Sequence, residues 1–165
     1  MYLLADATVT VQCPRAKVFD YAANLENFVK WFPGVVRIVA DNELSPASIG
    51  KQYVETVSVP LRGTRSVTIR VMDAAAPQRL ITHGDLRPLL PRMEMEFVDA
   101  GQDVCVVRWR MLSRNENRLV GGTMLPVAAW VIRRRADIAL SNLKRRLEGN
   151  HLDGSPPEDR SVATQ

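Results

Sequence analysis

Two polar side chains in predicted strands, His83 and Tyr53, are the candidates for catalysis. His83 is spaced by two residues from both Ile81 and Asp85 in a segment of strand-like composition. Its side chain could therefore point into the interior of the domain. An inward histidine can polarise a carbonyl group or move a proton near neutral pH. Tyr53 could supply a hydroxyl to the same pocket. The alternative is that His83 has a surface or structural role, which is the commoner fate of a lone histidine.

Two further charged residues lie close to this set in the sequence. Glu55 shares one strand face with Tyr53 and Val57 because the three are spaced by two residues. We expect Glu55 to face solvent, since the orientation of that strand is ambiguous. Arg65 is in phase with Val67 near the end of the next strand and could hold a carboxylate or an enolate at a pocket mouth. Its alternative role is a solvated surface cation.

No enzyme motif with a fixed spacing accompanies these residues. The sequence contains no GxSxG, Walker, Rossmann or HExxH pattern. Cys13 and Cys105 are the two cysteines, and both look structural. His151 falls in a predicted tail, so it cannot complete a metal site with His83. The sequence therefore predicts no metal and no cofactor.

Composition narrows the class of protein. A chain of 165 residues with 46% hydrophobic content is long enough for one domain with a sizeable core. The net charge of +4 comes largely from a short arginine run at 133–135 without interleaved aromatic residues, so we expect no nucleic-acid binding. The lack of a signal-like start, of a membrane-length apolar run and of a disulfide framework predicts a cytoplasmic protein.

The N-terminal elements are a strand and two short helices. Residues 2–12 are rich in β-branched side chains, as is typical of a strand. Pro14 suits the first turn of a helix, and Val18 and Phe19 follow in helical phase. Asn24 can end this helix and cap a second, shorter one, which Pro33-Gly34 then interrupts.

The middle of the chain predicts an antiparallel sheet. Strands are expected over residues 35–40, 52–59, 64–72, 79–86, 93–98 and 104–112. The last two form the clearest hairpin. Three apolar residues of one strand (Met93, Met95 and Phe97) and three of the other (Val107, Trp109 and Met111) share a face, while glutamates and arginines alternate with them.

The last predicted element is a long helix over residues 119–148. Its inward stripe consists of small and aliphatic side chains: Leu125, Ala128, Ala129, Ile132, Ala136, Ala139, Leu140, Leu143 and Leu147. Pro126 predicts a start or a kink, and Gly149 predicts the C-terminal cap. We therefore expect an ordered domain over residues 1–149 and a disordered tail over 150–165.

This order of elements resembles the START-like (SRPBCC) superfamily, which contains the polyketide cyclase/dehydrase and lipid transport family. The resemblance covers roughly residues 4–148, and the matching residues are Pro14, Val18, Phe19, Tyr21, Asn27, Trp31, Pro33, Gly34, Val35, Gly50, Leu143 and Lys144. It implies an α+β helix-grip fold, in which a curved antiparallel sheet of about seven strands wraps around the long C-terminal helix, with two short helices after the first strand. It also implies an apolar cavity between the sheet and that helix.

The expected function is binding of a small hydrophobic molecule, such as a polyketide, a lipid or an isoprenoid-like compound. Alanines on the helix opposite methionines on the sheet favour an open volume, and the alternative is that they allow close packing. The residues expected to line the cavity are Phe28, Trp31, Tyr53, Ile69, Ile81, His83, Met95, Trp109, Met111, Ala128 and Ile132. The enzyme alternative is a polyketide cyclase or dehydrase that uses the same cavity, where His83 or Tyr53 assists proton transfer.

A third possibility concerns the outer face of the long helix. Trp130 lies outside the inward stripe, beside Arg133 and Arg134, and this combination could dock on a membrane surface or a partner protein. The alternative, which we favour, is that loops or the short helices cover these apolar residues. The sequence leaves the oligomeric state open.

Overall fold

The computed structural model describes residues 1–59 and 63–152. In chain order the elements are β1 (Tyr2–Val11), α1 (Arg15–Ala23), the 3₁₀ helix η1 (Leu25–Lys30), β2 (Val35–Ala40), β3 (Gln52–Val59), β4 (Gly63–Ala75), β5 (Arg79–Gly84), β6 (Pro91–Asp99), β7 (Cys105–Ser113) and α2 (Arg118–Leu152). The seven strands form one antiparallel sheet in the order β1-β7-β6-β5-β4-β3-β2.

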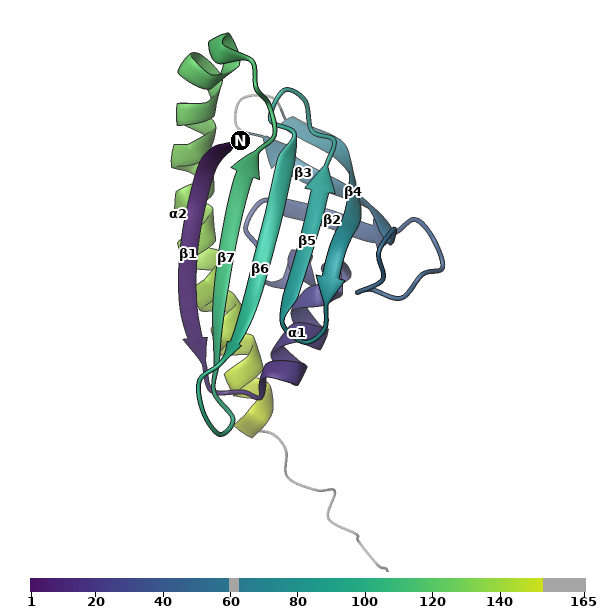
Figure 1. The fold of residues 1–165 in the computed structure, drawn as a ribbon, viewed down its shortest axis with the longest axis vertical. Coiled ribbons are helices and arrows are strands. Elements are labelled where there is room, and N and C mark those ends of the chain that lie inside the picture. The colour runs from purple at the N-terminus through teal and green to yellow at the C-terminus, as the bar shows by residue number, and fades with distance from the viewer. Residues whose placement is uncertain (60–62, 153–165) are drawn as a thin grey trace, which may run out of the picture.

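The helices occupy one face of this sheet. In Figure 1, α2 passes behind β1 and β7, and α1 lies behind β5, so that the opposite face of the sheet is turned toward the viewer. The sheet curves, and β2 and β3 lie behind the plane of the front strands. A curved antiparallel sheet around a long C-terminal helix, with two short helices after β1, confirms the predicted α+β helix-grip fold.

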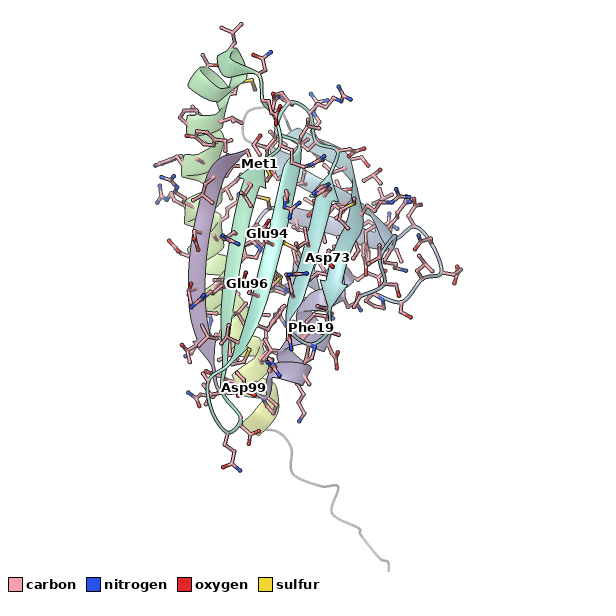
Figure 2. All side chains as sticks on the ribbon, viewed as in Figure 1. Met1, Phe19, Asp73, Glu94, Glu96 and Asp99 are labelled. Carbon is pink, nitrogen blue, oxygen red and sulfur yellow. The ribbon has the colours of Figure 1, made fainter. Side chains whose placement is uncertain are left out.

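The hairpin of β6 and β7 has the predicted register. Met95 stands opposite Trp109, and Glu94 stands opposite Arg110. Glu94 and Glu96 lie on the face of β6 that points away from the helices (Figure 2). On that face Arg110 Nη2 lies 2.8 Å from Glu94 Oε2. Hydrophobic alternation and cross-strand charge pairing therefore select the same register, as the sequence predicted.

The two short helices begin and end where the sequence places their caps. Pro14 precedes the first residue of α1, and Asn24 separates α1 from η1. The Asn24 side chain accepts a hydrogen bond of 3.2 Å from the backbone N–H of Glu26. This contact satisfies one of the free amides at the start of η1 and confirms the capping role expected for Asn24.

The long helix extends further than the sequence indicated. It runs from Arg118 to Leu152 and therefore passes Gly149, the predicted cap, while Pro126 lies within it. At its start, the backbone N–H of Leu119 donates to Asn117 Oδ1 at 2.9 Å. The rest of the predicted tail, residues 153–165, lies outside the described residues. No helix in the described ranges combines the length and apolar character that a membrane span requires.

Three side chains of α2 hold the η1 region and the end of β3. Asn142 Nδ2 donates to the carbonyl of Trp31 at 3.1 Å, and Arg146 Nε donates to that of Lys30 at 2.6 Å. One helical turn or more before them, Arg135 Nη1 donates to the carbonyl of Ser58 at 3.1 Å. These contacts join segments more than seventy positions apart in the chain and fix the position of η1 over the inner face of the sheet.

Candidate ligand-binding site

A small cavity lies between the inner face of the sheet and the segment that runs from η1 into β2. Its volume is about 70 Å³. The lining residues are Leu25, Phe28, Phe32, Val35, Glu55, Val67, Ile69, Thr82, Gly84, Pro91, Met93, Trp109 and Met111. Glu55 and Thr82 carry the oxygen-containing side chains of this wall, and Trp109 adds an indole N–H, so the cavity is an apolar space with few polar groups.

The strands supply the wall through their alternation. Val67 and Ile69 of β4 are two residues apart, as are Trp109 and Met111 of β7, and each pair therefore points to one face. Cross-strand pairing places Met93 opposite Met111, which brings the methionines together. For β6 and β7 these are the apolar faces that the sequence predicted.

The position of the cavity differs from the expectation. No described residue of α2 lines it, although the sequence analysis placed the cavity between the sheet and that helix. Ala136 and Ala139 are buried in the main core, and Ala129 packs in a second cluster with Leu4 and Leu125. The small side chains bring the helix close to the sheet, so the volume that they were expected to leave open is filled.

Aromatic rings limit the size of the cavity. The Phe32 ring lies 5.4 Å from that of Trp109 and 6.1 Å from that of Phe28, between centroids. Phe28 in turn lies 4.5 Å from Trp31. Pockets for drug-sized ligands have volumes of roughly 300 Å³ or more. A ligand of polyketide size therefore requires the Phe28 and Phe32 side chains to move.

The residues predicted to line the cavity separate into groups. Phe28, Ile69, Trp109 and Met111 lie in its wall. Trp31, Tyr53 and Met95 are fully buried in the core beside it without lining it. Ala128 and Ile132 pack against the second cluster, around Leu4 and Leu125.

His83 and Ile81 lie on the opposite face of the sheet, so the expectation that they point inward is wrong. Ile81 pairs with Glu94, and His83 pairs with Arg92. Arg92 Nη1 lies 3.2 Å from His83 Nε2, and a guanidinium only donates, so this ring nitrogen accepts. Burial, together with Arg114 and Arg92, lowers the pKa of His83. The alternate residues of β5, Thr82 and Gly84, line the cavity instead, because successive side chains of a strand point to opposite faces.

Glu55 lies in the cavity wall and is only partly exposed, which corrects the expectation that it faces solvent. Its cross-strand neighbours are Ile38 on β2 and Val67 on β4, which are buried apolar residues. Burial raises the pKa of Glu55 to about 7. The spacing with Tyr53 and Val57 was the available signal, but the sequence did not show which way that face points.

Three buried hydrogen-bond donors near the site have no partner among the described residues. They are the Trp109 and Trp31 indole N–H groups and the Tyr53 hydroxyl. The hydroxyl lies near the Leu25 backbone without forming a hydrogen bond of normal geometry, and burial raises the pKa of Tyr53 to about 12. Buried donors are usually satisfied in folded proteins, so unpaired ones beside a cavity indicate a place for an acceptor.

The cysteines have the character of core residues. Cys13 and Cys105 are buried free thiols. Burial raises the pKa of Cys105 to about 11 and also raises that of Cys13. A thiol of this kind is a poor nucleophile at neutral pH. Among the described residues, no three His, Cys, Asp or Glu side chains gather closely enough to hold a metal ion.

The outer face of α2 exposes apolar side chains, and the expectation that other segments cover them is wrong. Val127 is 65% exposed, Trp130 is 61% exposed and Ile138 is 53% exposed. The Arg134 guanidinium lies 5.2 Å from the centroid of the Trp130 ring. We call Val127, Trp130, Arg134 and Ile138 the outer helix stripe.

The curved seven-stranded sheet around a long C-terminal helix is the START-like (SRPBCC) helix-grip fold. Over residues 4–148, the sequence matches the family described as polyketide cyclase / dehydrase and lipid transport, and the chain belongs to this family. No curated protein sequence matches the chain significantly.

Solved structures show the same fold at low sequence identity. A Thermobifida fusca protein is 18% identical with a TM-score of 0.65, covering 87% of this chain and 91% of its own. A START superfamily protein from Mycobacterium smegmatis is 14% identical with a TM-score of 0.68, and the match covers 88% of this chain and 97% of that protein. The di-domain ARO/CYC StfQ from the steffimycin biosynthetic pathway is 15% identical with a TM-score of 0.63, covering 89% of this chain and 45% of its own.

Proposed function

We propose that the protein binds a small hydrophobic molecule, such as a polyketide, a lipid or an isoprenoid-like compound, in the cavity between the sheet and the η1–β2 segment. The observation that carries this proposal is the apolar wall with Glu55 and Thr82 as its polar groups. Such a wall provides burial for an apolar body, and few polar groups suffice to orient it. The two buried free thiols of the protein, Cys13 and Cys105, favour a reducing compartment, so we place the protein in the cytoplasm.

Ligand uptake can be measured by native mass spectrometry with a panel of apolar compounds. Val67→Phe places a ring in the cavity and should abolish uptake, and Ile69→Phe serves as a second variant. Met72→Phe, on the outer face of the same strand, is the matched control and should leave uptake unchanged. Equal uptake by wild type and both cavity variants would overturn the proposal.

The enzyme alternative is a polyketide cyclase or dehydrase, and Glu55 is the observation that favours it. A carboxyl with a pKa near neutrality can accept and return a proton within one reaction cycle. In this alternative Glu55 takes the role that the sequence analysis assigned to His83 or Tyr53. Turnover of a reactive poly-β-keto substrate should fall in Glu55→Gln and not in His83→Ala. The reverse order of effects would exclude this role for Glu55.

A second proposal concerns the outer helix stripe, which we infer to dock on an anionic membrane surface. Trp130 has an amphipathic ring of the kind that settles at membrane interfaces, and the exposed Arg133 and Arg134 beside it carry positive charge. The overall charge of +4 adds to this complementarity. A ligand carrier with such a face could collect its ligand from the bilayer.

Sedimentation with vesicles tests this surface. The wild type should sediment with phosphatidylserine-containing vesicles more than with phosphatidylcholine alone, and Trp130→Ser should reduce that binding. Ile49→Ser, which removes an equally exposed apolar residue elsewhere, is the control. Absence of vesicle binding excludes the membrane proposal. If Trp130→Ser instead abolishes self-association in analytical ultracentrifugation, the stripe is a protein interface.

A further inference from the structure

The cavity has one ionisable group in its wall among the described residues, the Glu55 carboxyl. On both sides of Glu55 the neighbouring strands present apolar side chains, Ile38 on β2 and Val67 on β4. The carboxyl forms no ion pair and no side-chain hydrogen bond within residues 1–59 and 63–152. A polar group in this position has no structural partner and is available to a ligand.

Charged groups on the surrounding elements do not set the state of this carboxyl. Arg65 stands two positions from Val67 on the same face of β4, but it is exposed. Arg135 of α2 is engaged by the Ser58 carbonyl, and Glu26 of η1 accepts from the Ala40 amide. Burial is the cause of the raised pKa of Glu55, so the carboxyl holds its proton up to about neutral pH.

A second donor lies in the same wall. Trp109 lines the cavity, and its buried Nε1–H has no partner among the described residues. A protonated carboxyl also donates through its O–H group. At neutral pH and below, Glu55 and Trp109 therefore give the wall two donors without a protein partner, in addition to the Thr82 hydroxyl.

We propose that Glu55, in its protonated form, and Trp109 select an uncharged apolar ligand with a carbonyl oxygen, to which they donate hydrogen bonds. This inference rests on the proposed binding function and adds the chemical class of the ligand. An apolar carboxylate is rejected, because its charge would lose its hydration in the cavity and would lie beside a second carboxyl. Ionisation of Glu55 removes one donor and weakens binding of the carbonyl compound.

Two probes of similar size test this selection, cyclohexanone and cyclohexanecarboxylate. Binding to the full chain is followed by amide chemical shifts in NMR titrations at about pH 6 and about pH 8.5, on either side of the Glu55 transition. The wild type should bind cyclohexanone roughly fivefold to tenfold more weakly at the higher pH, the loss expected for one hydrogen bond. It should bind the carboxylate more weakly than the ketone at both values.

Variants at Glu55 and Trp109 distinguish the effect of the hydrogen-bond donor on ketone binding from the effect of side-chain shape. Glu55→Gln keeps a donor and should bind the ketone equally at both pH values, whereas Glu55→Leu should bind it weakly at both. Trp109→Phe keeps a ring but loses the N–H, and should weaken ketone binding roughly threefold to tenfold at both pH values. Glu43→Gln, an exposed loop position, is the control and should retain the wild-type pH dependence.

The outcomes distinguish the two proposals. If ketone binding is independent of pH in the wild type and unchanged in Glu55→Leu, the selection by Glu55 is wrong while the binding function stands. Preference for the carboxylate overturns the selection as well. If the wild type binds neither probe and takes up no member of the apolar panel, the binding function itself is wrong.

Discussion

Arg135 of α2 lies directly against Gly34, so that a Cβ added to Gly34 would stand 2.5 Å from Arg135 Nη1. The same nitrogen donates to the carbonyl of Ser58 at 3.1 Å. Gly34 follows η1 and precedes β2, and its φ of +92° is one that residues with a side chain rarely adopt. The helix thus contacts the turn between Phe32 and Val35, which both line the cavity.

This contact predicts that Gly34→Ala destabilises the protein by about 2 kcal/mol or more, from backbone strain together with displacement of the Arg135 side chain. Gly63→Ala is the control, since Gly63 has φ +71° and nothing within 4 Å of an added Cβ. Gly63→Ala should lower the free energy of unfolding by about 1 kcal/mol. Urea unfolding measures this free energy for both variants. Equal losses in the two variants would show that the Arg135 contact contributes nothing.

Glu55 predicts a pH-dependent stability. Because its pKa rises from 4.5 to about 7 on folding, the folded state binds more protons than the unfolded state between these values. Stability therefore decreases as the pH rises through this interval. Glu55→Gln should unfold with a free energy on the order of 2 kcal/mol higher than wild type at about pH 8, and similar to wild type at about pH 4. Parallel stability curves would contradict the burial of this carboxyl.

The outer-face position of His83 predicts that it does not act in the cavity. His83→Ala should change the affinity for a bound ketone by less than about twofold, since the ring contacts Arg92 on the opposite face of the sheet. Isothermal titration calorimetry with the wild type and the variant measures this. A loss of about tenfold or more would mean that the ring reaches the ligand.

The Phe32 ring limits the size of the ligand that the cavity can admit, and a smaller side chain at this position should raise that limit. Its ring lies between Phe28 and Trp109, so Phe32→Ala should enlarge the cavity and admit longer ketones, at a stability loss of about 2 to 3 kcal/mol for a partly buried ring. Calorimetry with a series of ketones of increasing length measures the change. Phe19→Leu, in the core beside Phe97 and outside the cavity wall, should destabilise without altering the length preference. If both variants bind the series as the wild type does, Phe32 does not limit the cavity.

The register of β6 and β7 illustrates what could be predicted from residues alone. Met93, Met95 and Phe97 alternate with glutamates, and the facing strand alternates in the same way with arginines, so only one pairing satisfies both patterns. Asn24 similarly predicted the boundary between α1 and η1 from its capping chemistry. These features are local, since they depend on neighbours within one hairpin or one helical turn.

The orientation of β5 shows where the sequence was insufficient. Leu80, Thr82 and Gly84 alternate with Ile81 and His83, and neither set is clearly more apolar, so the period of two did not reveal the inner face. Which side of β5 faces inward depends on its pairing with β4 and β6, whose own inner faces are unambiguous. The sequence therefore left both sides open for His83, and its place beside Arg92 agrees with the surface or structural alternative.

For this protein the sequence by itself determined the order of the elements and the hairpin register, because these follow from local periodicity, caps and turns, and the family came from the resemblance of that order and of matching residues. The tertiary structure decided the site. Phe32 lies against Trp109, a residue of a distant strand, and no described residue of α2 lines the cavity. The raised pKa of Glu55 likewise arises from burial, at a position that pairs with Ile38 and Val67 on the two neighbouring strands, and this pairing exists only in the folded sheet.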